Sequence, residues 1–149
     1  MTTPSLIHHT FSIERRYSAP AEKVFAGWSD PESKRRWFNL NRGEHTMDFR
    51  VGGLEVNRSV GDNGKLLEFE SRYLNIVPDH RIVYASTLSA DGELATTSIT
   101  TIELSTEKAE TVLLLTESDV FLDGQEQPSW REQGTADWLG KLDTEFSSR

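Results

Sequence analysis

The feature that most constrains the fold is one long amphipathic helix, predicted at residues 129–148, after a chain that otherwise has the pattern of strands. Ser129 and Glu132 have the spacing of a capping box, and Pro128 just before them predicts a sharp helix start. At 3.6 residues per turn, one side of this helix carries an apolar stripe made of Trp138, Leu139, Leu142 and Phe146. A single helix of this kind predicts that an antiparallel sheet curls around it.

Alternation of apolar and polar residues predicts the strands. Two short helices with aromatic inner faces are predicted between the first strand and the second, because Pro20 and the pair Asp30–Pro31 are helix-start signals. The predicted strands cover residues 9–17, 44–51, 54–60, 66–77, 82–88, 93–104 and 111–121. The element order is therefore β-α-α-β6-α.

Turn residues separate these strands at hairpin distances. Asp62-Asn63-Gly64 and Asp91-Gly92 predict two hairpin turns, because Asn and Gly tolerate positive φ. Gly52-Gly53 predicts a turn or a close approach of two backbones. The apolar positions change parity near Leu74, which predicts a β-bulge. The fold class is α+β, with a curved antiparallel sheet of about seven strands.

Length and charge narrow the classes of function. The 149 residues predict one domain over 1–149, and the net charge of −8 argues against nucleic-acid binding, which needs a basic face. The basic run Lys34-Arg35-Arg36 is interpreted as a solvated helix end. With no cysteine, no leader pattern and no stretch of ~20 apolar residues, we expect a cytoplasmic protein that does not insert into a membrane.

Local motifs in a fixed order connect the chain to a known family. They are FSIER at 11–15, APAEKVF at 19–25, WSDP at 28–31, DFRVGG at 48–53, YLNIVPDHRIVY at 73–84, TE at 116–117, FLDG at 121–124 and Gly134. In this order, and over nearly the whole chain, they resemble the family named for the activator of heat-shock protein 90 (Hsp90) ATPase.

The resemblance implies the START-like or SRPBCC superfamily and the helix-grip fold of the birch pollen allergen. It implies a hydrophobic cavity between the sheet and the C-terminal helix, in a group whose members bind lipids, polyketides or hormones and include cyclases. The eukaryotic co-chaperone of the family has an additional N-terminal domain that grips the chaperone. Because the first predicted strand begins at about residue 9, we expect no such domain here.

Aromatic residues distributed over the helices and strands are expected to face one interior. They are either ordinary core or the wall of a ligand cavity, to which Tyr and Trp would add polar groups. The predicted ligand-cavity residues are Trp28, Trp37, Phe38, Phe49, Phe69, Tyr73, Tyr84, Glu117, Phe121, Trp138 and Leu142.

Glu117 and Asp119 have the same parity as the apolar residues of their strand. If that face is internal, desolvation would raise their pKa values and make them acid–base groups. The alternative, which the sequence favours, is that a bulge or strand end turns them to water, because charged residues are rarely buried unpaired. Arg72 is a candidate ion-pair partner. Ser86 and the row Thr96, Ser98 and Thr100 either add hydroxyl groups to the cavity or face solvent.

The four histidines, His8, His9, His45 and His80, have no metal-ligand spacing, and surface or strand-end positions are expected for them. We therefore predict no metal and no cofactor. The leading hypothesis is binding of a small hydrophobic molecule that is aromatic, polyketide or lipid-like. The alternatives are a cyclase- or hydrolase-type enzyme using cavity carboxylates or tyrosines, and a protein-interaction or co-chaperone-like module, with a homodimer left open.

Overall fold

The computed structural model describes residues 3–39 and 42–146. Its elements follow the predicted order, and the second short helix is divided between an α-helical and a π-helical turn. The elements are β1 (Leu6–Tyr17), α1 (Ala21–Ser29), α2 (Pro31–Lys34), η1 (Arg35–Asn39, the π-helical turn), β2 (Glu44–Met47), β3 (Leu54–Val60), β4 (Leu66–Val77), β5 (Arg81–Ala90), β6 (Glu93–Glu107), β7 (Glu110–Leu122), α3 (Pro128–Leu142) and η2 (Asp143–Glu145).

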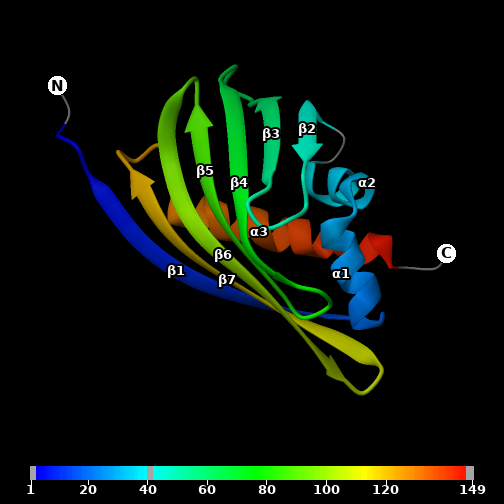
Figure 1. Cartoon of the computed structure of the whole chain (residues 1–149). Coiled ribbons are helices and arrows are strands. Elements are labelled where there is room, and N and C mark those ends of the chain that lie inside the picture. Colours follow the sequence, from blue (N-terminus) through cyan, green and yellow to red (C-terminus); the bar gives the residue numbers. More distant parts are fainter. Residues whose placement is uncertain (1–2, 40–41, 147–149) are drawn as a thin grey trace.

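The strands form one antiparallel sheet of seven strands in the order β1-β7-β6-β5-β4-β3-β2. Strands β2 to β7 are a meander, and β1 pairs with β7 along its whole length. The sheet curves around α3, while α1 and α2 lie beside the C-terminal part of α3 (Figure 1). The predicted α+β helix-grip fold is confirmed.

Two irregularities occur where the sequence predicts them, and a register shift of β5 against β6 between Leu88 and Ser89 was not predicted. The register of β4 against β5 shifts between Tyr73 and Asn75, which is the predicted bulge. A Cβ atom at Gly53 would lie 2.0 Å from the backbone oxygen of Asp48, so the predicted close approach is confirmed. The strand predicted over 44–51 is too long, because β2 ends at Met47 and the chain turns on Arg50 and Gly53 before β3.

Helix α3 begins differently from the prediction. Its first residue is Pro128 and its N-cap is Gln127, which gives no side-chain hydrogen bond. The predicted capping box is therefore wrong: Ser129 is inside the helix, and Pro128 occupies the first helical position, which its fixed φ favours. The end of the predicted helix, Ser147 and Ser148, lies outside the described residues.

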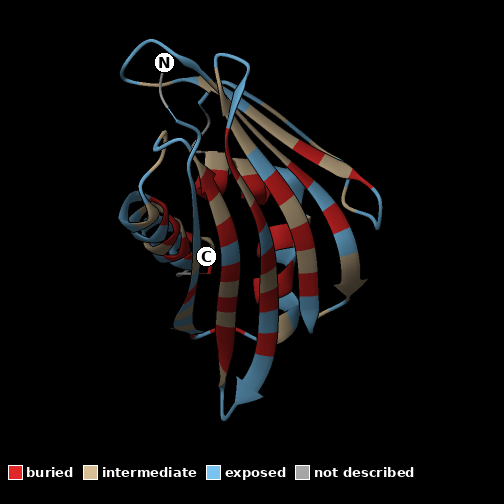
Figure 2. Cartoon of the chain, turned by 90° about the vertical axis from the view of Figure 1, so that its left-hand side faces the viewer, coloured by how far each residue is buried: buried red, intermediate tan, exposed pale blue. Residues whose placement is uncertain are grey.

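The apolar stripe of α3 is packed against the concave face of the sheet. Leu139, Leu142 and Phe146 are buried, and Trp138 is half-buried. The Tyr17 hydroxyl donates to the Leu139 backbone oxygen at 2.8 Å and ties α3 to β1. Figure 2 shows buried and exposed residues alternating along the strands, as one covered face and one open face require.

Candidate functional site

A pocket of about 280 Å³ lies between the N-terminal half of α3 and the concave face of the sheet. Trp130, Gly134 and Trp138 reach it from α3, because residues four apart share one helix face. A Cβ atom at Gly134 would meet no atom within 4 Å, so this helix turn leaves space open. The full lining is Phe38, Asn39, Arg42, Asn57, Ser59, Leu67, Phe69, Leu88, Glu126, Trp130, Arg131, Gly134 and Trp138.

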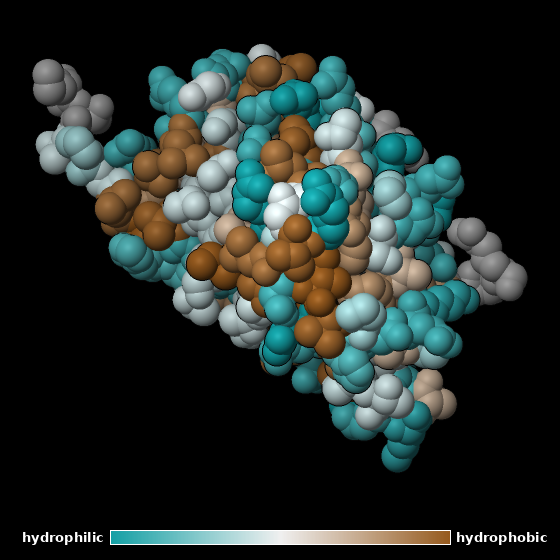
Figure 3. Space-filling view, viewed as in Figure 1, coloured by the Kyte–Doolittle hydropathy of each residue, from teal (hydrophilic) through white to brown (hydrophobic). Residues whose placement is uncertain are grey.

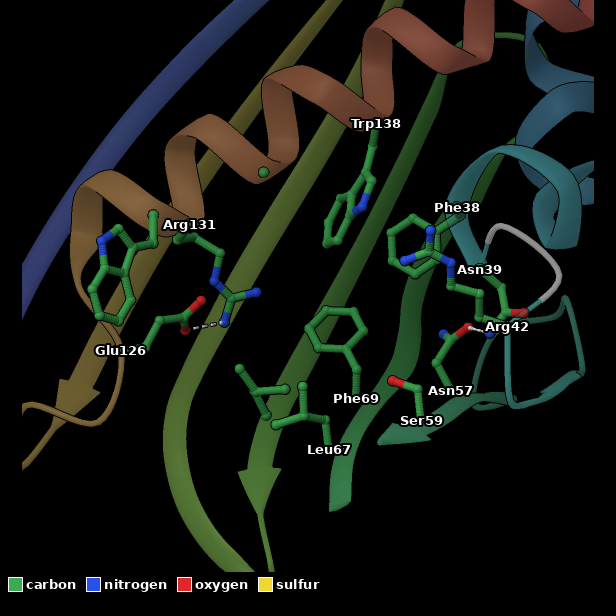
Figure 4. A pocket seen from close by; sticks show the side chains of 13 residues that line it. Phe38, Asn39, Arg42, Asn57, Ser59, Leu67, Phe69, Glu126, Arg131 and Trp138 are labelled. Carbon is green, nitrogen blue, oxygen red and sulfur yellow. Dashed lines mark hydrogen bonds and ion pairs between the residues drawn. The ribbon is translucent and has the colours of Figure 1, made fainter. Parts of the chain in front are cut away.

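Three aromatic side chains from three different elements form the middle of the pocket. The ring centroids of Phe38 and Trp138 are 4.5 Å apart, and that of Phe69 is 5.9 Å from Phe38 and 6.5 Å from Trp138. Figure 4 shows these rings between two polar ends. The wall is therefore apolar and aromatic with a few polar groups, which is the usual composition of a small-molecule site.

One polar end is built from side-chain amides. Asn39 Nδ2 donates to Asn57 Oδ1 at 3.1 Å, and Arg42 lies beside this pair (Figure 4). Asn39 Oδ1 and Asn57 Nδ2 are buried and make no hydrogen bond within the described residues. This end therefore has one acceptor and one donor to spare.

The other polar end is a buried charged cluster centred on Arg131. Only 4% of Arg131 is exposed; its Nη2 is 3.3 Å from Glu126 Oε1, and its Nε is 3.6 Å from Glu117 Oε2. Its guanidinium carbon is 5.5 Å from the Phe69 ring centroid. Hydroxyl groups of the sheet hold the carboxylates: Thr100 donates to Glu117 at 3.1 Å, and Thr96 donates to Glu126 at 2.6 Å.

Asp119 is the most unusual member of this cluster. It is 3% exposed, it lies opposite Ser98 in the sheet, and within the described residues its carboxyl group is hydrogen-bonded only to another acid, Glu117. Burial and the neighbouring Glu117 carboxylate raise the pKa of Asp119 to about 8. Asp119 and Glu117 are thus internal, so the water-facing alternative favoured by the sequence is wrong. The hydroxyl row of Thr96, Ser98 and Thr100 is internal as well.

Comparison with known proteins assigns the family. The model of the family of activator of Hsp90 ATPase homolog 1-like proteins matches residues 18–147. The chain belongs to this family. The resemblance predicted from the sequence motifs is therefore confirmed. Among curated proteins, none matches this sequence.

Solved structures similar to this family member share its fold. A protein of Rhizobium leguminosarum is 37% identical with a TM-score of 0.91, over 97% of each chain. The Mll3558 protein of Rhizobium loti is 37% identical with a TM-score of 0.89, over 95% of this chain and 99% of that one. The CV1439 protein of Chromobacterium violaceum is 26% identical with a TM-score of 0.78, over 94% and 98%.

In this Hsp90-activator-like chain the predicted cavity residues fall into three groups. Phe38, Phe69 and Trp138 line the open pocket. Trp28, Trp37, Tyr84 and Glu117 border only a void of about 10 Å³ beneath these three rings. The remaining predicted residues, Phe49, Tyr73, Phe121 and Leu142, border neither space. The deeper part of the interior is therefore closed by packed side chains.

The sequence interpretation missed a second buried charge cluster beneath α2. Lys34 is 2% exposed, and its Nζ donates to Glu55 Oε1 at 2.8 Å, so its interpretation as a solvated residue is wrong. Tyr73 donates to the same oxygen at 2.6 Å, and His45 Nε2 is 2.9 Å from Glu55 Oε2. The side chain of His45 is fully buried, contrary to the expected surface position. Burial alone would raise the pKa of Glu55, but the Lys34 charge and these hydrogen bonds lower it to about 2.

Arg131 was also missed, and Arg72 was the wrong candidate. Arg72 is exposed and donates to the Gly52 backbone oxygen at 2.7 Å. A signal for Arg131 exists in the sequence, because it precedes Thr135 and Leu139 by four and eight residues and therefore extends the buried stripe of α3.

The described residues give no sign of a metal centre or a membrane span. Within residues 3–39 and 42–146, no three His, Cys, Asp or Glu side chains are grouped as metal ligands would be. In the same ranges, none of the helices combines the length and apolarity needed to cross a bilayer.

The outer surface carries scattered apolar side chains. Ile7, Leu74 and Ile99 are exposed, on three different strands. Figure 3 shows brown apolar groups on this side of the molecule, interrupted by teal polar side chains. The interaction-module alternative and the homodimer stay predictions.

Proposed function

We propose that this protein binds a small, mainly apolar molecule in the pocket between α3 and the sheet. The observation that carries the proposal is the open space of about 280 Å³ with the Phe38, Phe69 and Trp138 rings on its wall. This volume is at the lower limit of ~300–1,000 Å³ typical of small-molecule sites. Membership of a family with the helix-grip fold supports the same proposal.

The test uses a side chain to fill the pocket. Gly134→Leu places four carbon atoms where a Cβ meets no neighbour, on a helix turn that lines the pocket. We expect this variant to bind the neutral fluorescent dye N-phenyl-1-naphthylamine at least tenfold more weakly than the wild type. The dissociation constants are measured by fluorescence titration, and native mass spectrometry checks the wild type for a co-purified ligand.

Gly140→Leu is the matched control. A Cβ there also meets no atom within 4 Å, but Gly140 is exposed and is not part of the pocket lining. Both substitutions remove a helical glycine, which favours the helix by up to about 1 kcal/mol. We therefore expect Gly140→Leu to bind the dye like the wild type. A wild type that takes up no dye and carries no co-purified mass would end the proposal.

A second candidate is acid–base catalysis on the bound molecule, and the buried Glu117 and Asp119 carboxyl groups favour it. Two carboxyl groups in different environments can act as acid and base. If this candidate holds, the wild type hydrolyses 2-naphthyl acetate faster than buffer does, and both Asp119→Asn and Glu117→Gln lose this activity. Equal rates in the wild type and both variants would contradict it and leave the binding proposal intact.

A further inference from the structure

The charged end of the pocket contains both donors and acceptors without hydrogen-bond partners. Arg131 Nε and Nη2 are buried at ion-pair distances from carboxylates but make no hydrogen bond within the described residues. Glu117 Oε2 is buried as well, and within the described residues it has no donor other than the neighbouring Asp119 carboxyl group. Buried polar atoms without partners in a native protein usually meet an ordered water or a ligand.

A ligand group that satisfies the charged end of the pocket has to accept one hydrogen bond and donate another. Arg131 offers only N–H donors, so it needs an acceptor. Glu126, which also lines the pocket, offers acceptors only; Thr96 donates to its Oε1, and its carboxylate can accept a further donor. A hydroxyl group does both with a single oxygen atom. An ether or a hydrocarbon edge leaves at least one side unsatisfied, which costs about 1–3 kcal/mol for each buried group.

The charges around Arg131 decide whether a neutral hydroxyl or a charged ligand group fits better at this end of the pocket. Two carboxylates, Glu117 and Glu126, face the single cation Arg131, and the Asp119 carboxyl lies behind them. A ligand carboxylate here meets this excess of acidic groups in a site of low dielectric, where like charges are costly. The other cation on the lining, Arg42, is exposed and lies beyond Phe69 with the amide pair (Figure 4). A neutral hydroxyl is therefore favoured over a carboxylate.

We propose that the ligand is a neutral phenol or alcohol whose hydroxyl oxygen accepts from Arg131 and whose hydroxyl proton is donated to Glu126, the two charged side chains of this cluster that line the pocket. The apolar body of the molecule lies against Phe69 and Trp138. This inference rests on the proposed function, and it adds a chemical class to the ligand.

Three probes of one ring size test the inference: 2-naphthol, naphthalene and 2-naphthoate. Their dissociation constants are measured on the wild type from the shifts of the Trp130 and Trp138 indole N–H signals in ¹H–¹⁵N spectra. We expect 2-naphthol to bind at least fivefold more tightly than naphthalene and at least tenfold more tightly than 2-naphthoate.

A variant assigns the discrimination to the charged cluster. Glu126→Gln removes one carboxylate from the pocket wall and keeps an oxygen that can accept from Thr96. We expect it to bind 2-naphthoate at least threefold more tightly than the wild type does. Glu132→Gln makes the same change of charge at an exposed position of α3 outside the pocket, and it should leave all three constants unchanged.

The outcomes separate the two proposals. Equal binding of 2-naphthol and naphthalene would overturn the inference, because water would then satisfy the cluster, and it would leave the apolar pocket standing. Tighter binding of 2-naphthoate would also overturn the inference alone. No binding of any probe, together with no uptake of the neutral dye, would refute the proposed function and the inference with it.

Discussion

Both ends of the interior contain buried charged side chains, but the two ends differ in how far these side chains are hydrogen-bonded. Beneath α2, Glu55 receives hydrogen bonds from Lys34 and Tyr73 and lies within 2.9 Å of His45. Lys34 is in turn 4.6 Å from the Phe38 ring centroid, close enough for a cation–π contact. Only a void of about 10 Å³ remains nearby. Both oxygens of the Glu55 carboxylate are therefore paired within a packed core, although His45 Nδ1 has no hydrogen-bond partner within the described residues; we call this the completed end because its carboxylate is satisfied.

Beneath the first turns of α3, the corresponding network is incomplete. Arg131 faces Glu117 and Glu126 without hydrogen-bond geometry, and within the described residues Asp119 is paired only with another acid, Glu117. The adjoining space is open. A satisfied buried network rigidifies a fold, whereas an unsatisfied one is costly unless something binds it. The comparison indicates that one end maintains the structure, whereas the other has the unsatisfied polar groups on which the proposed binding depends.

The largest effect is expected at the completed end. Lys34→Met keeps the apolar stem and leaves the Glu55 carboxylate buried without its cation, which should lower the free energy of unfolding by about 3–5 kcal/mol. Lys23→Met at an exposed position of α1 should change it by less than about 0.5 kcal/mol. Urea denaturation measures both. A loss below 1 kcal/mol in Lys34→Met would remove the distinction between the ends.

An intermediate effect on the free energy of unfolding is expected from Asp119, and it depends on pH. Its pKa is about 8 in the folded protein and 3.8 without the fold, so the folded state holds a proton that the unfolded state releases. Stability therefore falls as pH rises from 3.8 to about 8, by at most about 1.4 kcal/mol per pH unit. Between pH 5 and 7.5 the wild type should lose more stability than Asp119→Asn does, as measured by urea denaturation.

The sign of this pH dependence is opposite at the completed end. Because the pKa of Glu55 is lowered from 4.5 to about 2, its contribution is complete above pH 4.5 and is lost only as pH falls toward 2. Glu55 therefore stabilises the fold at all pH values between 5 and 7.5 and adds no pH dependence in that range. Identical pH profiles of the wild type and Asp119→Asn in that range would show that Asp119 is already ionised, and that its end is better solvated than we describe.

The smallest effect on stability is expected at the pocket rim. Trp130 is 63% exposed although it lines the pocket, so Trp130→Ala should change the free energy of unfolding by less than about 0.5 kcal/mol. Binding of N-phenyl-1-naphthylamine should weaken several-fold, because a bound molecule loses one apolar wall. Fluorescence titration measures this, and unchanged binding would place the ligand deeper than Trp130.

The fold could be predicted from the sequence because its signals are local. Alternation defined most strands, Asp91-Gly92 and similar pairs defined the hairpins, and the change of parity at Leu74 revealed the bulge. The start of α3 was predicted less well, because Pro128 at the first helical position replaced the capping expected from Ser129.

The candidate site could be predicted only in part, because buried charge depends on partners that are distant in sequence. Glu117 is held by Thr100 and Arg131, and Lys34 by Glu55. None of these pairs is visible until the strands and helices are assembled. Aromatic residues were easier to assign to the interior, but the division between pocket wall and packed core depends on how their rings meet.

The π-helical turn η1 determines how the lining of the pocket can be changed by a single deletion. It carries Phe38 and Asn39 to the pocket, and a π turn contains one residue more than an α turn. Deleting a single residue within η1 would remove the extra residue and let the turn relax to α geometry, and the residues after the turn would keep their orientation around the helix axis. One codon could therefore change how Phe38 and Asn39 reach the pocket, while the sheet stays as it is.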